Sequence, residues 1–287
     1  NKPSPLTDLA LETVLFNHGQ GKVSPMNIRE NERKSISAGE PEWKGATLYP
    51  VLYNIGNFKK GDSITIRCTF YSGQEDSGTA WVRARDVSDT ALFGDSEEQK
   101  IRIDKKKSGF VMFRFPNHQL ADKGILKEEL RLEWEYSYDR NTWKKMGASN
   151  HLIYTILGTP GYPWGGEDVF VWSNEEECRN RPWISALDVM YPYVKGIKDL
   201  KSLYRKITET VNSEFGFKYD VKQGRPKYYS ESDIFFYFYL AWCIKDMANH
   251  VEAIINCTAC AVIVTTFANL YGGQLSVRMI GSGFDCY

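Results

Sequence analysis

The sequence lacks an excess of charge of either sign. Lys and Arg together number 36, Asp and Glu also number 36, and the formal net charge is +0 at pH 7. Proteins that bind nucleic acid or anionic membranes present clustered positive charge, so this balance gives no electrostatic reason to expect either partner. We therefore expect no nucleic acid and no membrane as partner. Charged residues still make up 25% of the chain and aromatic residues 14%, which is typical of a folded globular protein.

Long apolar runs are also missing. The longest, from Ile234 to Ile244, is well short of the roughly 20 residues that a membrane-spanning helix needs. We predict instead a buried core helix over residues 234–247, with Ser230 as its N-cap and Asp233 at the third helical position. The N-terminus shows no basic region followed by an apolar run, so no signal peptide is visible, although a mature chain would have lost one. The sequence does not decide the cellular compartment, and we favour a secreted or delivered protein over a cytoplasmic one.

Strand-like alternation dominates the first half of the chain. Apolar and polar residues alternate from Ile64 to Phe70 and from Leu130 to Tyr138, which predicts half-buried antiparallel strands. Residues 1–157 are therefore predicted to form an immunoglobulin-like antiparallel β-sandwich, with the segment before Ala46 as a loop or N-terminal arm. Shorter runs that fit further strands lie at 79–84, 100–103 and 110–115, and Asp139–Thr142 fits a hairpin turn.

The pattern changes after residue 157. Prolines and glycines concentrate between Leu157 and Gly166, so residues 158–182 are predicted to be a linker. Apolar residues then recur at helical spacing from Leu200 to Phe215. These features predict an α+β domain over residues 183–287. Its other expected elements are helices over 183–193, 234–247 and 257–271 and a strand over 274–280.

Cys257 stands where the last of these helices begins. The partial positive charge of a helix N-terminus favours a thiolate, so this cysteine is a candidate nucleophile. An ordinary buried cysteine is the alternative, since cysteine is among the residue types most often found inside proteins. His250 precedes it at the end of another predicted helix, where a solvated or capping histidine is expected. Asn256 also opens a formal glycosylation sequon, and its place at a buried helix start argues against modification.

The neighbours of Cys257 resemble a known enzyme core. Ala261 follows four residues later, and Gly272 ends the apolar helix before a predicted strand. Together with the segments Tyr154–Pro160 and Pro182–Asp188, this resembles the transglutaminase-like core of the papain-like cysteine superfamily, as in bacterial two-domain members with an N-terminal β-sandwich. The resemblance implies thiol-dependent acyl transfer, as in a peptidase, amidase or transglutaminase. It also implies a protein or peptide substrate, Cys257 as nucleophile, and no cofactor or metal.

The chain departs from that family in one respect. In the family the histidine and its orienting partner follow the nucleophile on later strands, because the thiol needs a base held in one tautomer. Here the resemblance covers residues 154–287, and all four histidines lie before Cys257. Neither role can be carried over to a residue of this sequence. We therefore expect the chain to be inactive by itself, with the missing catalytic segment supplied by a further C-terminal region or by another chain.

The spacing Cys257-x-x-Cys260 leaves two other interpretations open. As a dithiol it resembles a thioredoxin-type motif, which normally follows a βαβ pattern. As a metal site it lacks the second Cys-x-x-Cys pair that would make a zinc centre a specific prediction. The zinc ligands would be Cys257, Cys260 and Cys286 with His250 or Cys243.

Two classes of function remain after these steps. The leading hypothesis is cysteine-dependent acyl transfer. The rival is a non-catalytic interaction protein, in which the β-sandwich binds an unknown partner and the second domain is a degenerate cysteine-protease-like fold. The sequence does not distinguish hydrolysis from transfer, and it identifies neither the substrate nor the oligomeric state.

Overall fold

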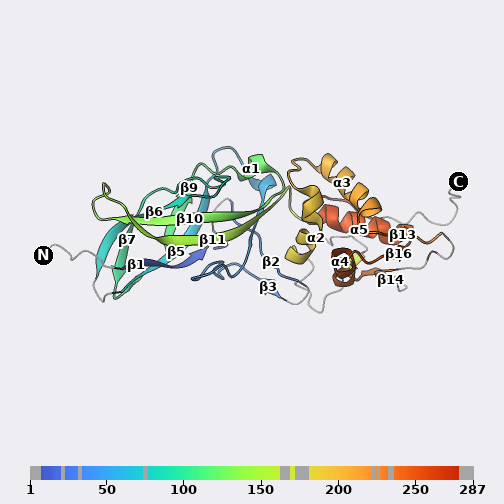
Figure 1. Ribbon diagram of the computed structural model, residues 1–287, viewed down its shortest axis with the longest axis horizontal. Helices are drawn as coiled ribbons and strands as arrows, with labels where there is room; N and C mark the ends of the chain where they lie inside the picture. The colour runs from blue at the N-terminus through green and yellow to red at the C-terminus, as the bar shows by residue number, and fades with distance from the viewer. Residues whose placement is uncertain are drawn as a thin grey trace. The chain divides into compact units, whose positions relative to one another are not determined.

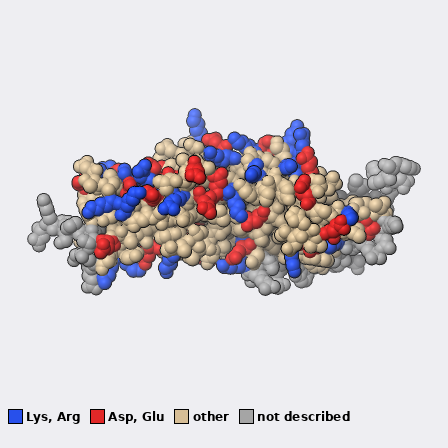
Figure 2. Space-filling view, in the orientation of Figure 1, with Lys and Arg blue, Asp and Glu red and all other residues tan. Residues whose placement is uncertain are grey.

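A computed structural model describes residues 8–20, 23–31, 34–73, 77–161, 169–171, 181–221, 224, 227–231 and 236–277. The chain divides into two compact units. Unit 1 comprises residues 1–27 and 36–156, and unit 2 comprises residues 28–35 and 157–287. On the face seen in Figure 2, acidic and basic side chains are interspersed rather than gathered by sign. No helix within the described ranges is both long enough and apolar enough to cross a membrane.

Unit 1 is built around one nine-stranded sheet (Figure 1). Its strand order is β1-β5-β8-β7-β6-β10-β11-β4, and β9 also pairs with β5. Neighbouring strands are antiparallel, except that β4 joins β11 in parallel. The strands are β1 Leu9–Leu15, β4 Val51–Asn54, β5 Ile64–Ser72, β6 Gly78–Asp86, β7 Gln99–Asp104, β8 Lys107–Ser108, β9 Val111–Phe115, β10 Lys127–Ser137 and β11 Lys144–Ile156. Two short helical turns, Ile55–Asn57 and α1 Leu120–Lys123, accompany them.

The predicted antiparallel β domain is therefore confirmed, but its expected division into two sheets is not seen among the described strands. One hydrogen-bonded path links β1 at one end to β4 at the other. The sheet curls, so that β1 also lies against β11 near the opposite end. Since sheets twist with a fixed hand, a sheet of this size can cover its own apolar face by curling. The segment before Ala46 contributes β1, so the expectation of a loop or arm there was wrong for Leu9–Leu15.

Alternation along the strands fills the core of unit 1. Ile64, Ile66 and Phe70 on β5 are fully buried, as the period of two predicts. Trp134 on β10 lies edge-on to Phe70 at 5.9 Å between ring centroids. Its indole Nε1 donates to Ser149 Oγ at 2.9 Å, which satisfies the one polar atom of this buried ring.

The predicted hairpin turn between β10 and β11 is confirmed. Asp139 Oδ1 accepts hydrogen bonds from the backbone N–H groups of Asn141 and Thr142, both at 2.8 Å. Arg140 takes a positive φ of 64°, as a tight turn of this kind requires of one of its residues. These bonds stabilise the ionised carboxylate and hold the pKa of Asp139 below its usual value.

Unit 2 mixes helices with short strands. Helix α5 packs against α3 and α2, and Figure 1 shows α5 and α3 running side by side. The helices are α2 Ile184–Val194, α3 Leu200–Ser213, α4 Leu240–Ala248 and α5 Cys257–Leu270. Strands β12 Val169–Val171, β15 Phe236–Phe238 and β14 Tyr229–Glu231 form one sheet, β13 Lys218–Tyr219 pairs with β16 Ile254–Ile255, and β2 Ile28–Arg29 pairs with β3 Ser35–Ile36.

The helices expected at 183–193, 200–215 and 257–271 are confirmed within a residue or two of their ends. Helix α3 shows why the periodicity was informative. Leu203, Ile207 and Val211 are all buried, and they lie on one face of the helix. Asp199 caps the helix, because its carboxylate accepts the Ser202 N–H at 2.9 Å.

The helix predicted over residues 234–247 was wrong in its first half. Residues 232–235 lie outside the described ranges, and Phe236–Phe238 forms β15, the central strand between β12 and β14. A continuous aromatic run suits a strand paired on both sides as well as it suits a buried helix. Ser230, the expected N-cap, belongs to strand β14. Helix α4 begins only at Leu240, after the Tyr239 N–H bonds to Tyr228 O at 2.7 Å.

The segment after α5 does not form the expected strand within residues 274–277, and 278–280 lie outside the described ranges. Instead, Asn269 binds both backbone groups of Leu275, at 2.8 Å each. The start of the predicted linker packs here too, since the Gly161 N–H donates to Asn269 O at 3.0 Å. Gly272, with φ +103°, lies so close to Gly158 that a Cβ at Gly272 would fall 2.2 Å from the Gly158 nitrogen.

Candidate thiol site at the start of helix α5

Cys257 occupies the first position of helix α5, and its side chain is exposed. Asn256 precedes it in an extended conformation, with φ −102° and ψ 177°, and its Oδ1 accepts the Ala259 N–H at 2.8 Å. This is the geometry of an N-cap, which fixes where the helix begins. The opposite side of the helix is buried, so α5 presents a thiol to solvent at the positive end of a helix fixed in a core.

The amide nitrogen of the Asn256 side chain is also hydrogen-bonded within unit 2. Asn256 Nδ2 donates to Gly224 O at 3.0 Å and to the Tyr229 hydroxyl at 2.5 Å, and the residue is 7% exposed. The amide that a glycosyl group would need is thus engaged inside the unit. The sequon is better explained as a helix cap, and the cap places Cys257 firmly at the surface.

A short strand immediately before α5 was missed by sequence reasoning. Strand β16 pairs in parallel with β13, and Tyr219 lies opposite Ile255, two residues before Cys257. The Lys218 N–H donates to Ala253 O and the Asp220 N–H to Ile255 O, both at 2.8 Å. Two-residue strands leave no periodic signal in a sequence, so only the long-range pairing reveals them.

This pairing brings Tyr219 next to the start of α5. A hydrogen-bonding interaction with the Cys257 side chain is the main reason why the pKa of Tyr219 is raised. Tyr219 is 58% exposed, so the contact lies at the surface of unit 2.

Cys260 lies one turn further along α5 and is partly buried. Burial, and secondarily the nearby Cys257, raise the pKa of its thiol. Both cysteines are free thiols in the structure. Of the two, Cys257 is the more accessible, as a nucleophile must be. The dithiol interpretation of this pair remains a prediction.

The expected zinc ligands do not come together in the part of the chain that the structure describes. No three His, Cys, Asp or Glu side chains within it are placed to hold a metal ion. Cys243 is fully buried, and burial raises the pKa of its thiol well above the usual value. Cys286 lies outside the described residues.

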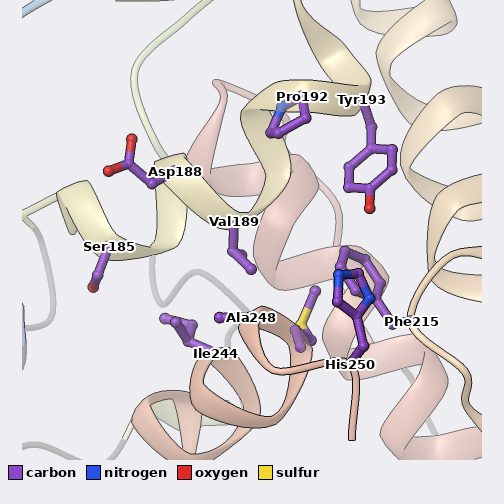
Figure 3. Close-up of a pocket in the computed structure, with 10 residues that line it drawn as sticks. Ser185, Asp188, Val189, Pro192, Tyr193, Phe215, Ile244, Ala248 and His250 are labelled. Atoms are coloured by element: carbon purple, nitrogen blue, oxygen red, sulfur yellow. The ribbon is translucent and has the colours of Figure 1, made fainter.

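His250 follows the end of α4, as expected, with its backbone N–H donating to Met247 O at 3.2 Å. It lines a groove of about 470 Å³ between α2 and α4, whose lining does not include Cys257. In Figure 3, His250 and Tyr193 stand at one end of this groove and Ser185 and Asp188 at the other. No hydrogen bond joins His250 to Cys257 among the described residues.

The other three histidines make hydrogen bonds inside unit 1. His18 Nε2 lies 3.1 Å from Thr65 Oγ1, His118 Nε2 lies 3.2 Å from Asp62 O, and His151 Nε2 lies 2.8 Å from Ser149 Oγ. Burial lowers the pKa of all three, that of His151 to about 3. A histidine base for Cys257 is therefore not identified within the described contacts.

Comparison with known proteins leaves the family open. No protein-family model and no curated protein matches the sequence. Similar solved structures include a CARDB domain from Pyrococcus furiosus in complex with di-metal ions, at 7% identity and TM-score 0.23, covering 34% of this chain and 81% of that one. Another is a glycosyl hydrolase family 2 member from Bacteroides cellulosilyticus, at 10% identity and TM-score 0.26, covering 68% of this chain and 23% of that one. A third is a Listeria innocua β-glucosidase in complex with glucose, at 13% identity and TM-score 0.20, covering 50% and 22%. None of these three is a transglutaminase-like protein, and at these values they establish no shared activity.

Proposed function

We propose that unit 2 carries a cysteine-dependent acyl-transfer site of the transglutaminase-like type, with Cys257 as its nucleophile. The observation that carries the proposal is the exposed thiol at the capped first position of α5, a helix whose inner face is buried and which packs against α2 and α3. A helix N-terminus favours thiolate, and a rigid helix holds the sulfur in one place. The protein or peptide substrate implied by the family resemblance belongs to the same proposal.

The chemistry balances without a cofactor. The Cys257 sulfur attacks the carbonyl carbon of an amide, a thioester forms, and the C–N bond breaks. The thiol proton leaves with the released amine. Water then hydrolyses the thioester, or a second amine takes the acyl group, and the thiol is restored. Backbone N–H groups at the start of α5 are suitable donors for the oxyanion, since the first turn of a helix directs them outward.

The general base of this mechanism comes, in our proposal, from residues outside the described contacts of Cys257. Amide cleavage needs that group twice, to accept the thiol proton and to protonate the leaving amine. An activated ester needs less, because its leaving group departs as a stable anion. The first half-reaction can thus be tested on this chain alone, whatever supplies the base.

The test uses p-nitrophenyl acetate and peptide mass spectrometry. We expect a burst of p-nitrophenolate with one acetyl group per protein, located on Cys257. The Cys257→Ser variant should lose the burst, while Cys260→Ser should keep it. Acetylation of Cys257 no faster in the folded protein than in the urea-unfolded protein would exclude an activated thiol. Acetylation mainly at Cys260 would identify that residue, one turn further along α5, as the nucleophile in place of Cys257.

A second candidate function rests on unit 1. Trp81 on β6 and Trp143, the residue before β11, both lie beneath arginine side chains. Arg83 lies 4.1 Å from the Trp143 ring and Arg140 lies 4.3 Å from the Trp81 ring. Tryptophan and arginine are enriched in the energetic centres of protein interfaces, and this supports a binding role for the β unit. The two functions separate in the acetylation experiment, since a pure interaction protein gives no burst.

A further inference from the structure

The ammonium group of Lys227 is held by three side chains of unit 2. Its Nζ lies 3.2 Å from Asp246 Oδ2, 5.0 Å from the centroid of the Tyr228 ring and 5.5 Å from that of Trp242. The two rings meet edge to face, with 5.1 Å between their centroids. Aromatic rings beneath a cation are the arrangement by which proteins recognise ammonium ligands. We call Tyr228, Trp242 and Asp246 the ammonium cage.

The cage is assembled by elements other than Lys227. Trp242 and Asp246 lie four residues apart on α4, so they share one face of that helix. A backbone bond fixes Tyr228 beside them, since the Tyr239 N–H just before α4 donates to Tyr228 O at 2.7 Å. Tyr228 takes a φ of 66°, which is an outlier for so bulky a residue. Backbone outliers of this kind gather at ligand clamps.

The carboxylate of the cage is oriented and largely removed from water. The Tyr228 hydroxyl donates to Asp246 Oδ2 at 2.8 Å. Burial, and then this bond, raise the pKa of Tyr228, so the phenol keeps its proton and remains a donor. Asp246 is 9% exposed, and a carboxylate so placed gains from a paired cation. Trp242 is 49% exposed, so one wall of the cage borders solvent.

We propose that the ammonium cage is a binding site for a lysine side chain of a partner protein, and that Lys227 fills it when no partner is bound. The resident cation shows which chemistry the cage accepts, because a primary ammonium donates to the carboxylate while its methylenes lie along the rings. A partner's lysine offers the same groups as Lys227, so the two exclude each other. Cys257 is no part of the cage, which therefore adds a second site to unit 2.

The experiment empties the cage with Lys227→Ala and titrates it with Nα-acetyl-lysine methylamide, following the indole N–H of Trp242 by NMR. We expect a dissociation constant on the order of 1 mM, as suits a ligand with few interacting atoms. Wild type should bind about tenfold more weakly, because the tethered Lys227 competes at a high effective concentration. Adding Asp246→Asn should abolish the binding. Lys218→Ala is the matched control and should bind like wild type, since Lys218 forms an exposed ion pair with Glu252.

The neutral counterpart, Nα-acetyl-norleucine methylamide, separates recognition of charge from filling of a void. Equal binding of the two compounds to Lys227→Ala would overturn the proposal, and so would no binding of either. Binding of n-butylammonium alone would overturn the assignment to a protein lysine, because it indicates a site for a free amine.

A second measurement needs no variant, since removal of Lys227 can destabilise the fold by leaving Asp246 buried without its cation. In the wild-type chain, acetic anhydride should label Lys227 several-fold more slowly than Lys218, as measured peptide by peptide. Equal rates would show that the cage does not hold an ammonium group and would refute the proposal.

Discussion

Removal of the Asn256 side chain tests whether the start of α5 is held as the structure shows. Asn256 makes three hydrogen bonds with one buried side chain: Oδ1 accepts the Ala259 N–H, and Nδ2 donates to Gly224 O and to the Tyr229 hydroxyl. The Asn256→Ala variant deletes all three at once. It also leaves an N–H at the first turn of the helix without its cap.

The expected loss of stability is a sum of those terms. An N-cap asparagine contributes about 1 kcal/mol relative to alanine. Each of the other two hydrogen bonds contributes about 1 kcal/mol. The total is about 3 kcal/mol, which should speed amide exchange along α5 by about 100-fold where exchange requires the helix to open.

Hydrogen exchange followed by mass spectrometry is the suitable assay, because it reports on each segment separately. Peptides from α5 should lose protection in Asn256→Ala, while peptides from β10 in unit 1 serve as the internal reference. Asn249→Ala is the matched control. Asn249 is an exposed asparagine at the end of α4, and its Nδ2 donates to Lys245 O at 2.7 Å. Loss of this exposed side-chain bond should cost about 0.5 kcal/mol or less. Equal effects of the two substitutions would refute the account of the cap and, with it, the fixed position of Cys257.

Two further predictions concern buried groups elsewhere. Burial raises the pKa of Glu42 from 4.5 to about 7, although its carboxylate accepts the N–H groups of Phe16 and Asn17. The folded protein therefore keeps a proton that the unfolded chain releases, so the unfolding free energy of unit 1 should fall by about 3 kcal/mol as pH rises from about 4.5 to about 7. Urea titrations of Glu42→Gln across this range should lack that component, and an unchanged pH dependence would contradict it. Gly272→Ala should lower the melting temperature of unit 2 sharply, since its Cβ would meet the Gly158 backbone. Gly196→Ala, with φ +78° and open space around it, should cost only about 1 kcal/mol, and equal melting temperatures would argue against the close backbone approach.

Periodic segments of the sequence predicted the fold well, and the reason is physical. The alternation along β5 and β10 and the helical spacing along α3 reflect one buried face each, and a buried face repeats in the sequence. The run before Trp242 carries no such period, because β15 has a partner strand on each side. When a segment has no polar face, its sequence shows neither the helical period nor the strand period, so an apolar strand cannot be told from an apolar helix. The curl of the sheet in unit 1 leaves no local signal either, since it depends on which strands pair.

In the candidate site, too, local features could be predicted from the sequence and long-range contacts could not. The position of Cys257 at a helix start was predictable, because an N-cap, an apolar helix and a glycine stop are all visible within a few residues of the sequence. The approach of Tyr219 was not, since what brings it next to the start of α5 is a parallel pairing of two residues with two, β13 with β16. The same argument applies to a catalytic base. A base is recruited by tertiary contact and not by sequence proximity, so the nearness of His250 along the chain carries little weight against its place in the α2–α4 groove. A group that would complete the proposed chemistry of Cys257 should therefore be identified among the residues that approach the N-terminal end of α5.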